Sequence, residues 1–226
     1  MNLFKLSGRI REIQVHLIFL SKPEFKKTDF ASFITFLKEQ ESKATRNFLL
    51  AIKDFNDKEL KSTEKEIRKI CLDIPAKKLS RKSEKFTRKK AKKIQCLHTE
   101  DPSIENVHKI RKHLKAMSTV SGLIFTIDPN EKLELIIKGL DKTEVMIGKW
   151  HDNIVLNKTI DLYLKNRKES QEDNLITLIK LRQSLIDDND NLLKQLMPDV
   201  SNIIQLILPS PEPDKTGLQD LQDQKK

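Results

Sequence analysis

The chain has 226 residues, with 43 Lys or Arg against 33 Asp or Glu and a formal net charge of +10. This length is enough for one large domain or two small ones with a sizeable core. Only 5 Gly, 8 Pro and 2 Cys are present, which argues against a turn-rich β architecture and against a disulfide framework. No apolar run approaches the roughly 18 residues of a membrane-spanning helix.

Amphipathic periodicity covers nearly the whole chain and predicts an all-α fold, with antiparallel helices joined by short turns as in helical bundles. The predicted helices cover residues 3–20, 30–55, 59–72, 79–97, 104–125, 131–148, 150–166 and 173–207. Asp29 and Ser103 are expected to cap the second and fifth of them, and Pro198 is expected to bend the last. The proline-rich remainder, residues 209–226, is predicted to be a disordered tail.

The positive charge is concentrated in one window of the chain. Residues 77–116 hold 14 Lys or Arg against 4 Asp or Glu, an excess of +10. The segments before and after it carry +4 and −4 and cancel each other. Such a window implies a polyanionic partner, which could be nucleic acid, an anionic membrane surface or a phosphate polymer.

The predicted helix after Ser103 carries a cationic row beside its apolar stripe. The row recurs at spacings of three and four residues, which places its members on one side of a helix. Neighbouring like charges in such a row repel each other by roughly 0.2–0.5 kcal/mol per pair, which a ligand with closely spaced negative charges would relieve. The row is His108, Arg111, Lys112 and Lys115, and the stripe is Val107, Ile110, Leu114, Met117, Ser121 and Ile124.

The segment 77–93 repeats this pattern, with ten Lys or Arg and one Glu. If the two helices pack antiparallel through Phe86, Ile94, Val107 and Ile110, both cationic rows could border one groove. Guanidinium groups bind phosphate oxygens in a bidentate manner, and lysines act as mobile point charges. The alternative is that the charge run is only a solvated helix face. The cationic residues that share one face here are Arg81, Lys85, Arg88, Lys89 and Lys92.

Three segments together resemble the CHAD family, the conserved histidine α-helical domain. VHKIRKHLKAM at 107–117 resembles the family's signature helix, His-x-x-Arg-x-x-x-Lys/Arg, although Lys115 stands where many members carry Arg. GRIRE at 8–12 resembles the segment that follows the first signature helix. IGKWHDNIVL at 147–156 resembles the corresponding segment of the second half. The resemblance covers most of residues 3–207.

The resemblance implies two pseudo-symmetric helical halves around a basic groove that binds inorganic polyphosphate without catalysis. Residues 1–75 would be a partial first half and 76–208 the second half of a single domain, because this chain shows only the second signature helix. Arg9 and Arg11 would reach the groove from the first half, and Lys149 and His151 are further candidates. The implied location is the cytoplasm, at polyphosphate granules; a reducing compartment also suits the two cysteines.

Other functions find less support in the sequence. Trp150-His151-Asp152 is more simply a core anchor with a cap than an acid–base pair, and the His and Cys spacings match no zinc pattern. Neither an enzyme site nor a cofactor is therefore expected. Nucleic-acid binding is the runner-up, although one Trp and one Tyr leave few rings for base stacking. A helical scaffold that meets an acidic protein is the third possibility.

Overall fold

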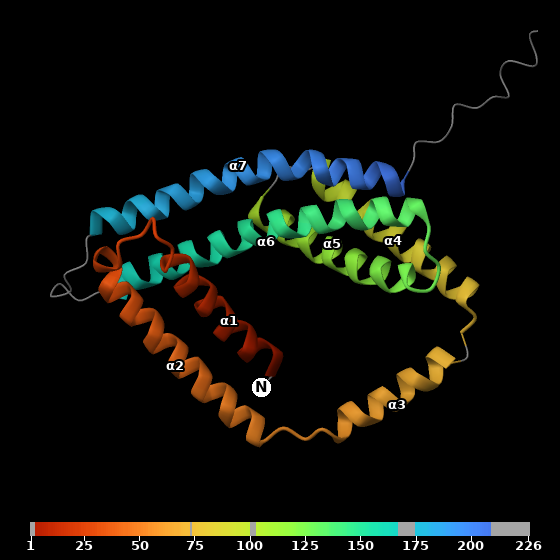
Figure 1. Cartoon of the computed structure of the whole chain (residues 1–226), viewed down its shortest axis with the longest axis horizontal. Coiled ribbons are helices and arrows are strands. Elements are labelled where there is room, and N and C mark those ends of the chain that lie inside the picture. Colours follow the sequence, from red (N-terminus) through yellow and green to blue (C-terminus); the bar gives the residue numbers. More distant parts are fainter. Residues whose placement is uncertain (1–2, 73, 100–102, 167–174, 209–226) are drawn as a thin grey trace, which may run out of the picture. The chain divides into compact units, whose positions relative to one another are not determined.

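The computed structural model describes residues 3–72, 74–99, 103–166 and 175–208. These ranges form α-helices, one short 3-10 helix and no strand, which confirms the predicted all-α fold (Figure 1). None of the helices that they contain is long and apolar enough to cross a membrane. The tail predicted at 209–226 lies outside the described residues. The elements are α1 (Leu3–Leu20), η1 (Lys27–Phe30), α2 (Ala31–Lys53), α3 (Lys58–Leu72), α4 (Ala76–Thr99), α5 (Ile104–Phe125), α6 (Glu131–Asn166) and α7 (Leu175–Ile207).

The helices begin and end close to the residues predicted from the sequence, with one exception at α6. The sequence predicts two helices, 131–148 and 150–166, but the structure has a single helix of 36 residues. Gly148 lies at the expected break, and a Gly inside a helix costs about 1 kcal/mol relative to Ala. Burial of Ile147 and Trp150 on the same helix outweighs this cost, at about 1.5–3 kcal/mol for each large apolar side chain.

The helix starts show which capping predictions were correct. The Ser103 side chain accepts a hydrogen bond from the backbone N–H of Asn106 at 3.2 Å, which confirms the predicted cap of α5. The predicted Asp29 cap is wrong. Asp29 lies inside the 3-10 turn η1, and α2 begins after Phe30 without a side-chain cap. Asn130 caps α6, because its Oδ1 accepts from the N–H of Leu133 at 2.9 Å.

Replacing Ser103 with Ala should remove the cap of α5 and lower the free energy of unfolding by about 1 kcal/mol. Ser103→Asp should retain most of the stability, since a carboxylate also accepts from the N–H groups of the first turn and suits the helix dipole. Chemical denaturation followed by circular dichroism measures both. Equal losses in the two variants would contradict the capping role.

The described chain divides into two compact units. The first unit comprises Met1–Ile74 and Met146–Gln195, and the second comprises Pro75–Val145 and Leu196–Lys226. Helices α6 and α7 each run without a break from one unit into the other. The division near residue 75 coincides with the expected division between halves, but residues 146–195 group with the first segment of the chain.

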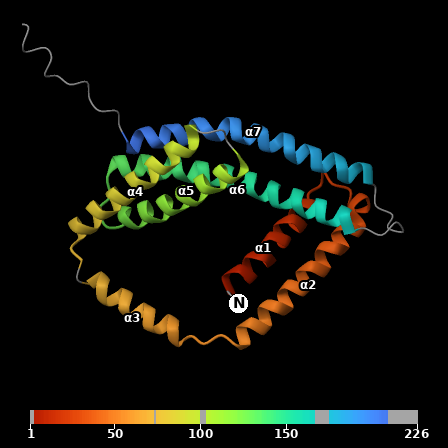
Figure 2. The ribbon, with the colours of Figure 1, turned by 180° about the vertical axis from the view of Figure 1, so that it is seen from behind.

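The first unit has a core formed by α1, α2 and the parts of α6 and α7 that belong to it. α1 packs along α2, as both ribbon views show (Figures 1 and 2). Tyr163 of α6 contacts Phe33 and Phe36, with ring centroids 5.1 and 5.3 Å apart. The core residues are Ile13, Leu20, Phe30, Phe33, Leu37, Ala44, Leu156, Ile160, Tyr163, Leu178, Leu181 and Leu185.

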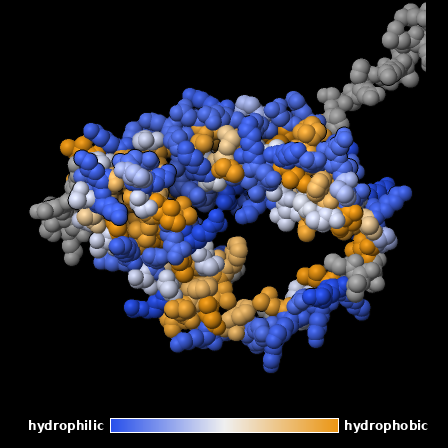
Figure 3. Space-filling view, viewed as in Figure 1, coloured by the Kyte–Doolittle hydropathy of each residue, from blue (hydrophilic) through white to orange (hydrophobic). Residues whose placement is uncertain are grey.

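The apolar periodicity of the second predicted helix extends beyond this core. Ile52 and Phe55, at the carboxyl end of α2 and just after it, are exposed, as are Leu49 and Leu50. Figure 3 shows this apolar surface together with the start of α1, where Phe4 is exposed. The amphipathic pattern therefore predicted the helix correctly, but not the burial of its last turns.

In the second unit, α4 packs along α5 and is fixed near both ends. Near its start, Ser80 Oγ donates to Asp128 Oδ2 at 3.0 Å. Near its end, His98 Nε2 lies 3.1 Å from Ser201 Oγ on α7. These contacts hold the charged helix against its neighbours.

Candidate functional site

The apolar stripe predicted on α5 is buried at every position. Val107, Ile110, Leu114 and Met117 are each at most 1% exposed. Ser121 and Ile124 continue the stripe and are buried as well. This face fixes the rotation of α5 about its axis and so decides which side its cations occupy.

The apolar side of α4 differs from the predicted one. Ile94 is fully buried as expected, but Phe86 is 36% exposed and Lys90 Nζ lies 5.1 Å from its ring centroid. Thr87 and Ala91 are buried in its place. Phe86 and Thr87 are about 100° apart around the helix, so α4 is turned relative to the predicted orientation.

The five cationic residues predicted on α4 line one surface groove. The groove has a volume of about 810 Å³. Leu208, just after α7, also lines the groove, and Glu84 is the one carboxylate among the lining residues that the structure describes. The lining cations are Arg81, Lys85, Arg88, Lys89, Lys92 and Lys93.

Most of the charge in this groove is not neutralised by acids. Glu84 pairs with Arg88, with Oε1 2.9 Å from Nη2 and 3.2 Å from Nε. Among the residues that the structure describes, no ion pair involves Arg81, Lys85, Lys89 or Lys92. These side chains therefore remain available to an external anion.

The positive charges of α4 act on His113 of α5. Partial burial, together with repulsion from Lys90 and Lys93, lowers the pKa of His113 below its ordinary value. The imidazole therefore stays neutral near pH 7. Lys93 also lines the groove, so the same charge that disfavours a protonated His113 favours a bound anion.

The cationic row on α5 lies on a different surface from the α4 groove. His108 and Arg111 are half-buried, whereas Lys112 and Lys115 are exposed. Lys112 lies about 200° around the helix from the buried Ile110, which places it on the opposite side of α5. None of the four row residues is among those that line the α4 groove. The second unit thus carries two cationic surfaces.

The remaining predicted site residues belong to the first unit. Arg9 and Arg11 are exposed on α1, and Arg9 lines a cavity of about 200 Å³ beside His16. Lys149 is engaged internally, because its Nζ pairs with Asp188 Oδ2 at 3.0 Å. His151 Nδ1 lies 3.6 Å from Asp152 Oδ1, too far for a hydrogen bond.

Four groove residues were absent from the predicted set, namely Glu84, Lys93, Cys96 and Leu208. Lys93 follows Lys92 in the same basic run but lies outside the helical face that the sequence predicted as cationic. Leu208 is separated from α4 by more than a hundred residues, and no local pattern connects it to the groove. Only the packing of the end of α7 in the second unit brings it there.

The chemistry available in the groove is electrostatic binding. Its described lining residues are cations, one carboxylate, Cys96 and Leu208, and no histidine that could act as a base is among them. Within the described ranges, no group of three or more His, Cys, Asp or Glu could hold a metal ion. Comparison of the chain with protein-family models, with curated proteins and with solved structures finds no significant match. The resemblance to the CHAD family therefore stays a prediction.

Proposed function

We propose that this protein binds inorganic polyphosphate, without catalysis, along the α4 groove. One observation carries the proposal: of the residues that the structure describes, six cations and one carboxylate, all on α4, line one groove. At about 1.5 Å per residue, Arg81 and Lys92 are about 16 Å apart along the helix axis. A linear chain of phosphates can contact such a row along its whole length.

The electrostatics of α4 also support a polymeric anion. Lys85 and Lys89, like Lys89 and Lys93, are four residues apart on one helix, so each pair repels. One polyanion that spans them replaces this repulsion with several attractive contacts. Guanidinium groups such as Arg81 add bidentate contacts to phosphate oxygens.

Nucleic acid is the competing ligand, and the residues that line the groove favour polyphosphate over it. Proteins that hold single strands stack the bases on aromatic rings, and duplex readers place Asn, Gln or Arg against base edges. Among the residues that the structure describes, no aromatic, Asn or Gln side chain lines the groove. The described lining therefore lacks rings for stacking bases and amides for reading adenine, whereas its Arg81 and Arg88 would serve either ligand. Membership in the CHAD family, and a location in the cytoplasm at polyphosphate granules, belong to the same proposal.

We expect the protein to bind long-chain polyphosphate more tightly than double-stranded DNA at an equal concentration of phosphate. Fluorescence anisotropy with labelled polyphosphate, competed by unlabelled DNA and by unlabelled polyphosphate, measures the preference. The affinity should fall steeply as salt rises, because bound cations are released. If DNA displaces polyphosphate as well as polyphosphate itself does, the groove is a general polyanion site and the proposal is wrong.

A further inference from the structure

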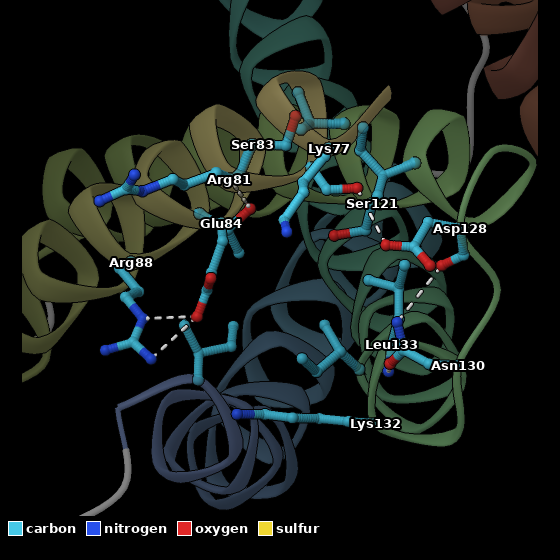
Figure 4. Close-up of a pocket in the computed structure, with 16 residues that line it drawn as sticks. Lys77, Arg81, Ser83, Glu84, Arg88, Ser121, Asp128, Asn130, Lys132 and Leu133 are labelled. Carbon is cyan, nitrogen blue, oxygen red and sulfur yellow. Dashed lines mark hydrogen bonds and ion pairs between the residues drawn. The ribbon is translucent and has the colours of Figure 1, made fainter. Parts of the chain in front are cut away.

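Another cavity of the second unit adjoins the α4 groove, and Arg81, Glu84 and Arg88 of α4 line both. It has a volume of about 490 Å³, within the roughly 300–1,000 Å³ of small-molecule sites. Its walls come from α4, α5, the start of α6 and the last residue of α7, all within the second unit. Figure 4 shows it in close-up.

The wall of this cavity is largely aliphatic. Its apolar side chains are Val120 and Ile124 from α5, Leu133 and Ile136 from α6, and Ile207 from α7. No aromatic ring of the described chain lines it, so these residues offer no surface for stacking a base or another flat ring. An aliphatic chain suits such a wall best.

One buried hydroxyl in this wall lacks a hydrogen bond. Ser121 is 2% exposed, and its Oγ has no hydrogen-bond partner in the described part of the chain. A buried hydroxyl without a partner is unfavourable, because it has lost its hydrogen bonds to water. If the Ser121 side chain turns toward an acceptor atom of a bound ligand, its hydroxyl gains the hydrogen bond that it lacks.

The charge at the cavity favours an anion. Among its described lining residues, four cations stand against the two acids Glu84 and Asp128, and Glu84 already pairs with Arg88. Lys77 and Lys132 make no ion pair within the described ranges. In Figure 4, Lys77 extends from α4 toward the middle of the cavity and Lys132 lies along its opposite edge.

We propose that this cavity binds a single-chain anionic amphiphile, a fatty-acid-type carboxylate. The carboxylate accepts hydrogen bonds from the Lys77 ammonium and the Ser121 hydroxyl, and Lys132 adds a second positive charge. The aliphatic chain packs on Leu133, Ile136 and Ile207. This site is separate from the polyphosphate proposal, although Arg81, Glu84 and Arg88 border both the cavity and the α4 groove.

Isothermal titration calorimetry with dodecanoate, at concentrations below its critical micelle concentration, tests this site. We expect saturable binding of one dodecanoate per chain, about 10-fold weaker binding of dodecan-1-ol, and no binding of dodecyltrimethylammonium. The double variant Lys77→Ala with Lys132→Ala should weaken dodecanoate binding by about 10-fold or more. The double variant Lys78→Ala with Lys82→Ala is the matched control, because both residues are exposed on α4 and line neither site.

The cavity variant Leu133→Trp supplies a second test, because it fills the space of the chain and leaves the lysines intact. It should abolish dodecanoate binding while circular dichroism stays unchanged. Replacing Lys85, Lys89 and Lys92 with Ala should leave dodecanoate binding intact, which separates this site from the α4 groove. Unsaturable binding, equal binding of the cationic amphiphile, or equal losses in the lysine variant and its control would overturn the proposal.

Discussion

Replacing Lys85, Lys89 and Lys92 together with Ala should lower the affinity for polyphosphate by about 10- to 100-fold. Each exposed charge contact contributes up to about 1 kcal/mol, and a loss of 1.4 kcal/mol is tenfold. The slope of log affinity against log salt should fall by about 2, because three phosphate contacts are lost at about 0.7 each. Titrations at several salt concentrations measure both quantities. Folding should be unaffected, since all three side chains are exposed.

The control for this experiment is the triple variant Lys78→Ala, Lys82→Ala and Lys165→Ala. It removes the same charge from exposed helical positions that do not line the groove. Its affinity should fall much less, through the change in net charge alone. The double variant Arg111→Ala with Lys112→Ala tests the α5 row, and we expect a smaller loss than in the groove variant. If the groove variant and the charge control lose affinity equally, polyphosphate does not bind along α4.

Acid should destabilise the first unit through His16, by about 3 kcal/mol between pH 7 and pH 4. Burial lowers the pKa of His16 to about 4 from an ordinary value of 6.5, although the charge of Asp152 acts in the opposite direction. Between these two values the unfolded chain binds a proton that the folded chain does not, so unfolding is favoured as pH falls. The stabilisation is complete above about pH 6.5 and is lost progressively toward pH 4.

Denaturant unfolding of His16→Gln at several pH values measures this effect, with Trp150 fluorescence as the signal. The variant should be less stable than the wild type at pH 7, because a buried contact changes, and the difference should shrink as pH falls. Ile13→Val is the control, because it trims a buried residue of the same helix without adding or removing a titrating group. Its cost, about 0.5–1.5 kcal/mol, should be the same at every pH. A constant difference between His16→Gln and the wild type would contradict the assignment.

The local part of the fold was predictable because periodicity and capping act over a few residues. The stripe on α5 and the Ser103 cap involve spacings of three or four positions, and both agree with the structure. The single helix α6 was missed because Gly148 weakens a helix locally, whereas the burial that keeps it intact depends on distant partners. The same holds for Ile52 and Phe55, whose exposure no local pattern can reveal.

The candidate site was predictable only as a face of one helix. The five chosen cations of α4 do share one groove, because their spacing alone fixes that they point the same way. Which face of α4 packs against its neighbours depends on the rotation of α4 about its own axis. The burial of the small side chains Thr87 and Ala91 sets this rotation. Beside Phe86, neither residue stands out in the sequence as part of the buried face. The sequence therefore predicted one groove for both cationic rows, whereas in the structure the α5 row does not line the α4 groove.

The order in which the chain is synthesised has a consequence for the second unit, which is assembled from two separate stretches. Val200 and Ile203 of α7 are buried in this unit, and a Cβ added to Gly139 of α6 would lie 3.0 Å from Ile203. A ribosome adds about 5–20 residues per second, so α4 emerges roughly 5–20 s before these residues do. The most positive stretch of the nascent chain therefore remains incompletely covered until the buried residues of α7 have been synthesised. For the same reason, no contiguous fragment that ends before residue 196 can reproduce this unit.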